Sequence, residues 1–559
     1  MKRLKFFVGL LTLLVLFSFS FSITEEEAIV QRLEKEIVPL INKDRVRFNI
    51  PGLSVALVSR GKIIWKKGFG YRDREENLAA TPETIYRVGS ISKLFNAVAI
   101  IRESEKGRLN LDVPLEKYCP QIKFKNKFTE PAEISLRHLI THRAGILRES
   151  PVGHYFDDSE PSLKATAESM KGTPLIYPPG TRTKYSNIGV GISGYVLEKV
   201  SQIDYCRYLK KFVLNPLGMK ASSFSLKDIS QEKLAKGYMR DLAGQQWEAP
   251  HFRFGYIPAA NLYSSVIELS KFVNFILNEG QPLLSKKAFQ EMVKIQFNRQ
   301  GASVGFGLGF HISKIHGYRT IGHNGAVYGF SSNLLVIPEE KLGVVVCNNL
   351  DGANGFNYKL VNYILGIALE VKTGQKLVEI PKIKVLPEEE LKIYEGKYKG
   401  PGEPLWIVAK EGHLFYQPYG AARELDYLGQ DVFITDDLLG YGEKIVFKRK
   451  GKAIEGLEIN GNFYRKVEVK EEKNKFPTEW RELLGEYGPD FNIMKVYVKD
   501  GRLIVLIEWF YEYPLLPERG LKFKFPDYGL YMGEEVLFRK EGERVKDVLI
   551  GAVCFKKRD

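Results

Sequence analysis

Cysteine is scarce in this sequence, with four residues among 559, and no two of them form a CxxC pair. So few cysteines in a chain of this length exclude a small scaffold built on disulfides, although they leave open a disulfide whose partners the sequence cannot identify. The chain also lacks an arginine-rich run and any nucleic-acid-binding motif. We therefore interpret its net charge of +15 as a solvated surface rich in lysine and glutamate, and we expect no nucleic-acid partner.

Histidine is also rare, with eight residues, and the zinc-binding pattern HExxH is absent. His138 and His142 are four residues apart in a segment with helical spacing, which would place both on one face of a helix. No third ligand accompanies them in the sequence. We interpret both as packing residues, and we expect neither a metal nor another cofactor.

A long hydrophobic run stands near the N-terminus, where three basic residues among the first five precede residues 6–21. Serine and threonine are the only polar residues in the run, and acidic residues follow it. This order is typical of a secretory signal peptide, here residues 1–22, and predicts an exported protein that is periplasmic, secreted or at the cell surface. The run is long enough that an uncleaved membrane anchor is the alternative. No cysteine lies near its end, so we expect no lipid anchor.

The composition, with 44% hydrophobic and 27% charged residues, is that of a globular protein. Within residues 24–370, segments with strand-like patterns lie at both ends, and segments with helical spacing lie between them. This order predicts an α+β domain in which strands from both ends close one antiparallel sheet that is flanked by helices. Residues 371–387 are rich in lysine, proline and valine, and we interpret them as a linker.

A weak internal repeat follows the linker, with an offset of roughly 90 residues. The segment YEGKY at residues 394–398, for example, resembles LGEY at residues 484–487. Each copy alternates apolar and polar residues between turn signals, which is typical of short antiparallel strands. The sequence therefore predicts two small all-β modules, either barrels or sandwiches: β-module 1 at residues 388–470 and β-module 2 at residues 477–559. Two divergent halves of a single β-domain are the alternative.

A serine three residues before a lysine on a helix can support nucleophilic chemistry, because both side chains share one face and the amine can reach the hydroxyl. The pattern S-x-x-K occurs three times, at Ser59–Lys62, Ser90–Lys93 and Ser230–Lys233. Only Ser90 follows a loop and opens an apolar helical segment, whereas Ser59 lies in a hairpin turn and Ser230 in a polar stretch. Ser90 is therefore the candidate nucleophile, and a helix-capping serine is the alternative.

Two further elements follow Ser90 along the chain. Residues 185–187 (YSN) open a helical segment, and residues 323–325 (HNG) lie at the end of a strand-like segment. With S-x-x-K, Y-x-N and H-x-G in this order, residues 25–370 resemble the serine β-lactamase and penicillin-binding-protein superfamily. The tyrosine and histidine forms are similar to those of class C β-lactamases, D-aminopeptidases, D-Ala-D-Ala carboxypeptidases and related esterases. The two C-terminal modules resemble, more weakly, the lipocalin-like β-domains appended to some members.

The resemblance implies a catalytic role for four residues. Ser90 would attack a carbonyl carbon and form an acyl-enzyme. Lys93 and Tyr185 would share the role of the base, and the sequence does not choose between them. His323 would orient Tyr185 or bind the carboxylate side of the substrate.

The resemblance also implies a substrate-binding role for three residues. Asn187 would form a hydrogen bond with Lys93 or with the substrate. Gly325 and Ala326 would belong to the strand that contacts the substrate. The oxyanion hole would consist of the backbone N–H groups of Ser90 and Ala326.

Two other patterns imitate known catalytic motifs. K-T-G at residues 372–374 follows a helical run and leads into the linker, so no strand presents it. G-x-S-x-G at residues 301–305 lacks the strand before it and the helix after it that a nucleophile elbow requires. We expect neither pattern to be catalytic.

The resemblance leaves the substrate open, because one scaffold serves several reactions in this superfamily. A peptidase or amidase acting on short or D-amino-acid-containing peptides is the preferred interpretation. A carboxylesterase, a β-lactamase and a low-turnover penicillin-binding or sensor protein are the alternatives. The β-lactamase is disfavoured because nothing in the sequence marks a glutamate that activates a deacylating water. The expected partners are a small peptide, ester or β-lactam-like substrate and, for the β-modules, a cell-wall polymer. Oligomerisation is left open.

Overall fold

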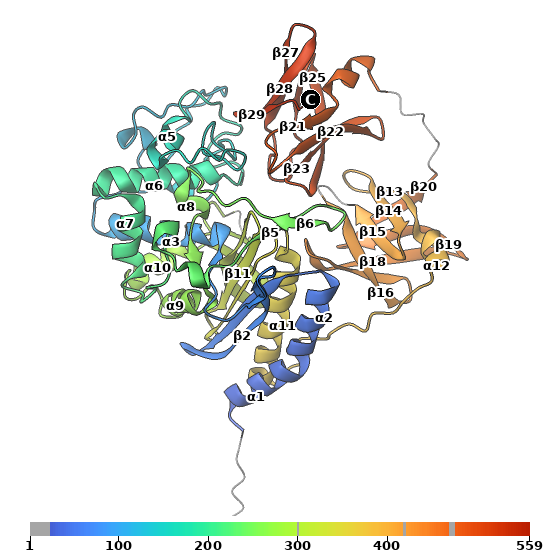
Figure 1. The fold of residues 1–559 in the computed structure, drawn as a ribbon, viewed down its shortest axis with the longest axis horizontal. Coiled ribbons are helices and arrows are strands. Elements are labelled where there is room, and N and C mark those ends of the chain that lie inside the picture. Colours follow the sequence, from blue (N-terminus) through green and yellow to red (C-terminus); the bar gives the residue numbers. More distant parts are fainter. Residues whose placement is uncertain (1–22, 299–300, 418–420, 469–475, 559) are drawn as a thin grey trace, which may run out of the picture.

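The structure is a computed structural model that describes residues 23–298, 301–417, 421–468 and 476–558 (Figure 1). The predicted signal peptide, residues 1–22, lies outside the described residues. Within the described ranges, no helix combines the length and the apolar character needed to cross a membrane. The four cysteines all lie within these ranges, and all are free thiols.

The N-terminal domain is built around an eight-stranded antiparallel sheet with the strand order β3-β2-β1-β12-β11-β10-β9-β8. β1 pairs with β12 in a register that places Val55 opposite Val346. Strands from the two ends of the domain are therefore neighbours in the middle of the sheet, which confirms the α+β architecture expected from the sequence. The strands are β1 (Gly52–Ser59), β2 (Lys62–Asp73), β3 (Leu78–Ala79), β8 (Gly305–Phe306), β9 (His311–Ile315), β10 (Tyr318–Val327), β11 (Phe330–Ile337) and β12 (Leu342–Asn348).

Helices cover both faces of this sheet (Figure 1). Alternate side chains of β1 point to opposite faces, so Leu53 and Val55 belong to one hydrophobic core and Ala56 and Val58 to another. The first core is closed by helices from the two ends of the domain, α1 (Glu25–Arg32), α2 (Val38–Arg47) and α11 (Asn354–Thr373). The second core is closed by the segment between β3 and β8, which contains α3 (Ser92–Glu105), α4 (Leu136–Ile140), α5 (Leu163–Glu168), α6 (Asn187–Ser201), α7 (Tyr205–Leu209), α8 (Ile257–Ala260), α9 (Val266–Leu277) and α10 (Lys286–Met292).

The described residues of β-module 1 form a closed barrel of eight antiparallel strands around a core of their own. The barrel docks on α2 and α11 through buried charges, because Lys359 Nζ binds Asp44 Oδ2 at 2.8 Å and Asp436 Oδ2 at 2.5 Å. The strands are β13 (Gly396–Lys399), β14 (Leu405–Lys410), β15 (His413–Gln417), β16 (Arg423–Gly429), β17 (Val432–Asp436), β18 (Tyr441–Lys450), β19 (Ala453–Ile459) and β20 (Asn462–Val467).

The described residues of β-module 2 form two antiparallel sheets, β21–β24 and β25–β29, that share a separate core. Separate cores favour two modules over two halves of one β-domain. Phe156 of the N-terminal domain packs into this core, 4.7 Å from the Phe555 ring, so β-module 2 lies against the helical region. The strands are β21 (Gly485–Tyr487), β22 (Met494–Lys499), β23 (Arg502–Ile507), β24 (Tyr511–Pro514), β25 (Leu516–Arg519), β26 (Lys522–Lys524), β27 (Glu535–Glu541), β28 (Arg544–Ile550) and β29 (Val553–Lys556).

Candidate active site

Ser90 lies in a short 3-10 turn, Gly89–Ile91, that leads directly into α3. Gly89 has a φ of +51°, a region that glycine adopts without strain. A Cβ on Gly89 would lie 2.7 Å from the backbone oxygen of Ala326, so only glycine permits this close approach. The turn therefore brings Ser90 beside the end of β10.

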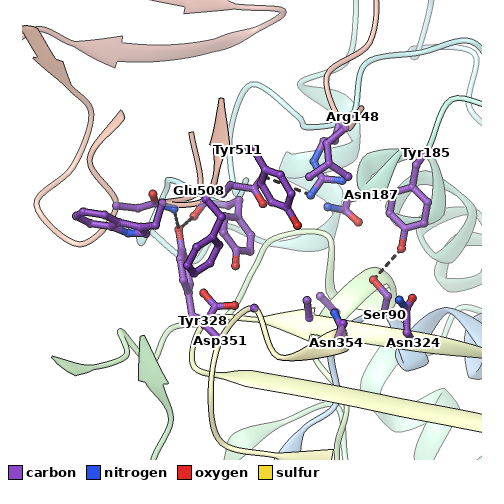
Figure 2. A pocket seen from close by; sticks show the side chains of 18 of the residues that line it. Ser90, Arg148, Tyr185, Asn187, Asn324, Tyr328, Asp351, Asn354, Glu508 and Tyr511 are labelled. Carbon is purple, nitrogen blue, oxygen red and sulfur yellow. Dashed lines mark hydrogen bonds and ion pairs between the residues drawn. The ribbon is translucent and has the colours of Figure 1, made fainter. Parts of the chain in front are cut away.

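The Ser90 hydroxyl has two polar partners at hydrogen-bond distance. Lys93 Nζ, one helical turn further along α3, lies 2.9 Å from Ser90 Oγ, and the Tyr185 hydroxyl lies 2.7 Å from it. Figure 2 shows the tyrosine above the serine at one side of a cavity. The structure thus brings together three residues that the sequence analysis assigned to one site.

Lys93 is buried, and its amine nitrogen has three polar partners. Besides Ser90, Nζ contacts Asn187 Oδ1 at 3.0 Å and the backbone oxygen of Ala259 at 2.8 Å. Burial, and then the nearby charge of Arg148, hold the pKa of Lys93 well below its usual value. A neutral amine has a lone pair that can accept the hydroxyl proton of Ser90.

Tyr185 stands immediately before α6, whose N-cap Ser186 accepts a hydrogen bond from the Gly189 N–H at 2.9 Å. Burial raises the pKa of Tyr185 to about 12. The phenol therefore stays protonated near neutral pH and can donate a hydrogen bond to Ser90.

His142, and not His323, is the ring in direct contact with Tyr185. Its ring stacks on Tyr185 with a centroid separation of 4.1 Å, and its Nδ1 accepts the backbone N–H of Ser186 at 3.2 Å. The expectation that His138 and His142 share a helical face is wrong, because α4 ends at Ile140 and His142 has a φ of +58°. The two histidines consequently occupy different environments.

His323 lies on β10 and does not line the cavity. Its ring centroid is 6.3 Å from that of Tyr185, and no hydrogen bond joins the two rings. Nδ1 lies 2.5 Å from the backbone oxygen of Asn324, and Nε2 is buried with no hydrogen-bond partner among the described residues. Burial lowers the pKa of His323 to about 3, so the ring is neutral. The structure therefore shows no direct hydrogen bond through which His323 would orient Tyr185.

The end of β10 presents alternate residues to the cavity. Asn324 and Ala326 are exposed and line it, whereas Gly325 is buried and does not. A Cβ on Gly325 would lie 2.0 Å from the backbone oxygen of Val88 and 2.5 Å from Ser332 Oγ. Gly325 thus allows the strand to approach the loop before Ser90, and the structure shows no contact between Gly325 and the cavity.

The cavity has a volume of about 330 Å³ and is lined by residues from all three parts of the chain. Ligand pockets of this size are common in enzymes. β-module 1 contributes Leu439, and the β23–β24 hairpin of β-module 2 contributes residues 508–511. The sequence analysis assigned no residue of either module to the site.

A chain of polar contacts connects the nucleophile to β-module 2. Asn187 Nδ2 donates to Glu149 Oε1 at 2.7 Å, and Arg148 Nε lies 3.3 Å from the same oxygen. Arg148 also faces Glu508 Oε1 at 3.4 Å. Burial raises the pKa of Glu149, although Arg148 opposes the shift. The sequence analysis missed these three charged residues, because nothing distinguishes the loop pair Arg148-Glu149 or a glutamate in a hairpin from ordinary surface polarity.

Comparisons with known proteins identify the family and the fold of the chain. The sequence model of the beta-lactamase family matches residues 30–369. Protein flp of Staphylococcus aureus strain MW2 is 26% identical over 324 residues, which are 57% of this chain and 63% of the relative. Beta-lactamase-like protein 2 of Dictyostelium discoideum is 27% identical over 334 residues, which are 58% of this chain and 60% of the relative. The matches therefore span less than two thirds of these curated relatives.

Solved structures share the fold. The octameric penicillin-binding protein homologue from Pyrococcus abyssi is 25% identical, with a TM-score of 0.56, over 86% of this chain and 99% of that chain. This share exceeds the range of the family model and so includes part of the β-modules. EstCE1, described as a hydrolase with promiscuous acyltransferase activity, is 20% identical, with a TM-score of 0.51, over 61% of this chain and 99% of that chain. Because the family model matches more than half of the sequence and the fold agrees, the chain belongs to the beta-lactamase family.

Proposed function

We propose that this chain is an exported serine hydrolase that forms an acyl-enzyme on Ser90 and acts as a peptidase or amidase on short or D-amino-acid-containing peptides. One observation carries the proposal: Ser90 Oγ lines a cavity and lies between Lys93 Nζ at 2.9 Å and the Tyr185 hydroxyl at 2.7 Å. The family relationship supports it, since a penicillin-binding protein homologue and a hydrolase share the fold.

Acylation begins with the removal of the Ser90 hydroxyl proton. Lys93 is the base in this proposal, because burial holds its pKa well below the usual value and so favours the neutral amine, whereas Tyr185 with a pKa of about 12 stays protonated. Ser90 Oγ forms a bond to the carbonyl carbon while its proton passes to Lys93 Nζ. The carbonyl electrons move to oxygen, where the backbone N–H groups of Ser90 and Ala326 stabilise the charge.

Collapse of the tetrahedral intermediate breaks the bond to the leaving nitrogen, which needs a proton. The Tyr185 hydroxyl donates that proton, and the Lys93 ammonium then passes the proton taken from Ser90 to the Tyr185 oxygen. The net result is the transfer of one proton from Ser90 to the amine product. Water then attacks the acyl-enzyme and gives one proton to the neutral Lys93 amine. Release of the acid returns this proton to Ser90.

The edge of β10 favours an extended peptide as the substrate. β9 pairs with β10 only as far as Gly322, so the edge from His323 to Val327 is not covered by β9. Backbone groups on such an edge can bind a peptide as an added strand. An ester without peptide groups would leave them unmatched.

Glu149 does not favour a β-lactamase. Its carboxylate is buried, accepts the Asn187 amide at 2.7 Å and pairs with Arg148 at 3.3 Å, and it does not line the cavity. A carboxylate held in this way cannot activate a deacylating water beside Ser90.

Turnover of short peptide p-nitroanilides of D and L configuration tests the proposal and separates an enzyme from a sensor. We expect many turnovers per wild-type molecule and none for Ser90→Ala, with an unchanged circular dichroism spectrum for the variant. A wild-type protein that remains acylated after one turnover would support the low-turnover alternative. Activity in Ser90→Ala would contradict the proposal.

Export has its own test. The native chain, produced in a host with a secretion pathway, should yield a mature protein whose N-terminus lies near residue 23. Protein that retains residues 1–22 and sediments with membranes would support the anchor alternative instead.

A further inference from the structure

The phenol of Tyr185 needs a support that does not depend on Ser90. Among the described residues, its hydroxyl has one hydrogen-bond partner, Ser90 Oγ at 2.7 Å. In the proposed reaction this oxygen becomes bonded to the acyl carbon, and at that stage the phenol must give its proton to the leaving nitrogen. The position of the phenol therefore depends on what surrounds its ring and its backbone.

The Tyr185 ring has its closest described aromatic neighbour in His142. The two rings stack with a centroid separation of 4.1 Å and an angle of 28° between their planes. Lys93 Nζ lies 4.9 Å from the centre of the Tyr185 ring, and Arg148 Cζ lies 5.9 Å from it. The centroid of His323 is 6.3 Å away. His142 therefore supplies the flat surface against which the phenol packs.

His142 also holds the backbone on both sides of Tyr185. Its backbone oxygen accepts the N–H of Lys184 at 2.8 Å, and its Nδ1 accepts the N–H of Ser186 at 3.2 Å. One histidine thus contacts three consecutive residues, 184–186. A side chain whose ring is packed and whose backbone is fixed on both sides has few conformations left to it.

His142 is itself held in place. The residue is 3% exposed, and the Phe306 ring packs edge-on against it at 5.1 Å. Burial, and then the charge of Lys93, hold the pKa of His142 well below its usual value, so the ring is neutral. A neutral ring that accepts at Nδ1 carries its proton on Nε2. His142 does not line the cavity, so it can act on the reaction only through residues that do, such as Tyr185.

We propose that His142 is a positioning residue that holds the Tyr185 hydroxyl where it can protonate the leaving nitrogen. The sequence analysis gave the orientation of Tyr185 to His323 as one of two possible roles, and the contacts of the phenol assign it to His142 instead. This role rests on the proposed acyl-enzyme chemistry at Ser90. Ser90 and Lys93 would stay in contact without His142, because they are one helical turn apart. Loss of His142 should therefore impair protonation of the leaving group more than attack by Ser90.

A leaving group that needs no proton separates these two effects. One acyl group is presented as a p-nitroanilide, whose nitrogen must be protonated, and as a p-nitrophenyl ester, whose phenolate departs without a proton. Both substrates give the same acyl-enzyme, so the two values of kcat/KM report the steps up to its formation. In His142→Ala, we expect kcat/KM to fall about tenfold to a hundredfold for the anilide and less than about threefold for the ester. A merely structural role would lower both values by the same factor.

Two further variants each retain one contact of His142. His142→Asn keeps a side-chain oxygen that can accept the Ser186 N–H, and asparagine tolerates the φ of +58° at this position. His142→Phe keeps a ring to stack on Tyr185 but has no acceptor. Each should raise the ratio of kcat/KM for the ester to that for the anilide, by less than His142→Ala does. These two variants carry the test if His142→Ala does not fold.

Tyr185→Phe removes the proposed proton donor and should also raise the ratio of ester to anilide. His142→Asn added to Tyr185→Phe should raise it no further, because the group that His142 positions is then absent. A further rise by the full factor that His142→Asn produces in the wild type would overturn the inference.

His138→Phe is the matched control. The His138 ring stacks on Phe297 at 5.1 Å and does not line the cavity, so its replacement should leave the ratio unchanged. Labelling of Ser90 by a fluorophosphonate reports, for every variant, whether the site is folded. Labelled His142 variants in which the ratio equals that of the wild type would overturn the positioning role alone. A wild type that is not labelled at Ser90 would overturn the proposed function and this inference with it.

Discussion

Replacing Glu534 by alanine should loosen the contact between β-module 2 and the N-terminal domain. Glu534 Oε1 accepts Lys184 Nζ at 2.7 Å and the backbone N–H of Arg148 at 2.8 Å. The side chains of Lys184 and Glu534 are 0% and 3% exposed, so water reaches neither partner. The variant would leave a buried ammonium and a buried N–H without an acceptor.

The expected loss of stability follows from this burial. Removing one partner of a buried ion pair costs about 3–5 kcal/mol, because the remaining charge keeps its desolvation penalty. Lys184→Met should cost a similar amount, since among the described residues it leaves the Glu534 carboxylate with the Arg148 N–H as its one donor. The double variant Lys184→Met/Glu534→Leu replaces the pair by apolar side chains and should lie within about 1 kcal/mol of the wild type. The single variants are therefore strongly non-additive.

Hydrogen exchange provides the assay, because a protein with several modules does not unfold in one two-state step. The amide of Asn187 donates to the Arg148 carbonyl at 2.9 Å, close to the contact. Its exchange in Glu534→Ala should be roughly a hundredfold to a few thousandfold faster, which corresponds to the lost free energy. Amides of β12 serve as the control and should exchange at the wild-type rate. A change of less than threefold at Asn187, or equal acceleration in β12, would refute the reasoning.

Two further predictions concern the site itself. Lys93→Met should lower kcat/KM by roughly a hundredfold to ten-thousandfold in an anilide assay, because it removes the proposed base. A variant that keeps a tenth of the activity would contradict that role. Gly325→Ala should lower kcat/KM at least about a hundredfold, since its Cβ would lie 2.0 Å from the Val88 oxygen and displace β10. Gly317→Ala is the control: it strains the β9–β10 turn, because Gly317 has a φ of +85°, but its Cβ would meet no atom within 4 Å, so β10 should keep its place and kcat/KM should be unchanged.

Local patterns explain why much of the fold and part of the site could be predicted. Ser90 and Lys93 are one helical turn apart, so their contact depends on a single helix. Tyr185 and Asn187 both lie at the start of α6, and both reach the Ser90–Lys93 pair. The alternating strands and the amphipathic helices likewise gave the α+β class and the all-β C-terminal part.

The remaining features depend on contacts that no local pattern encodes. Arg148 and Glu508 meet across 360 residues, through the docking of a separate module. Asp351 has a pKa raised to about 7 because it is buried and lies near Glu508 of β-module 2, and its neighbour Gly352 contacts both modules. The stacking of His142 on Tyr185 follows from the early end of α4 at Ile140, which helical spacing did not reveal.

The most direct test of the account is the intact mass of the protein after incubation with a fluorophosphonate, with Ser90→Ala treated in parallel. The proposed arrangement of Ser90, Lys93 and Tyr185 predicts a single covalent adduct on the wild type and none on the variant. Equal labelling of both proteins, or of neither, would contradict the assignment of Ser90 as the nucleophile.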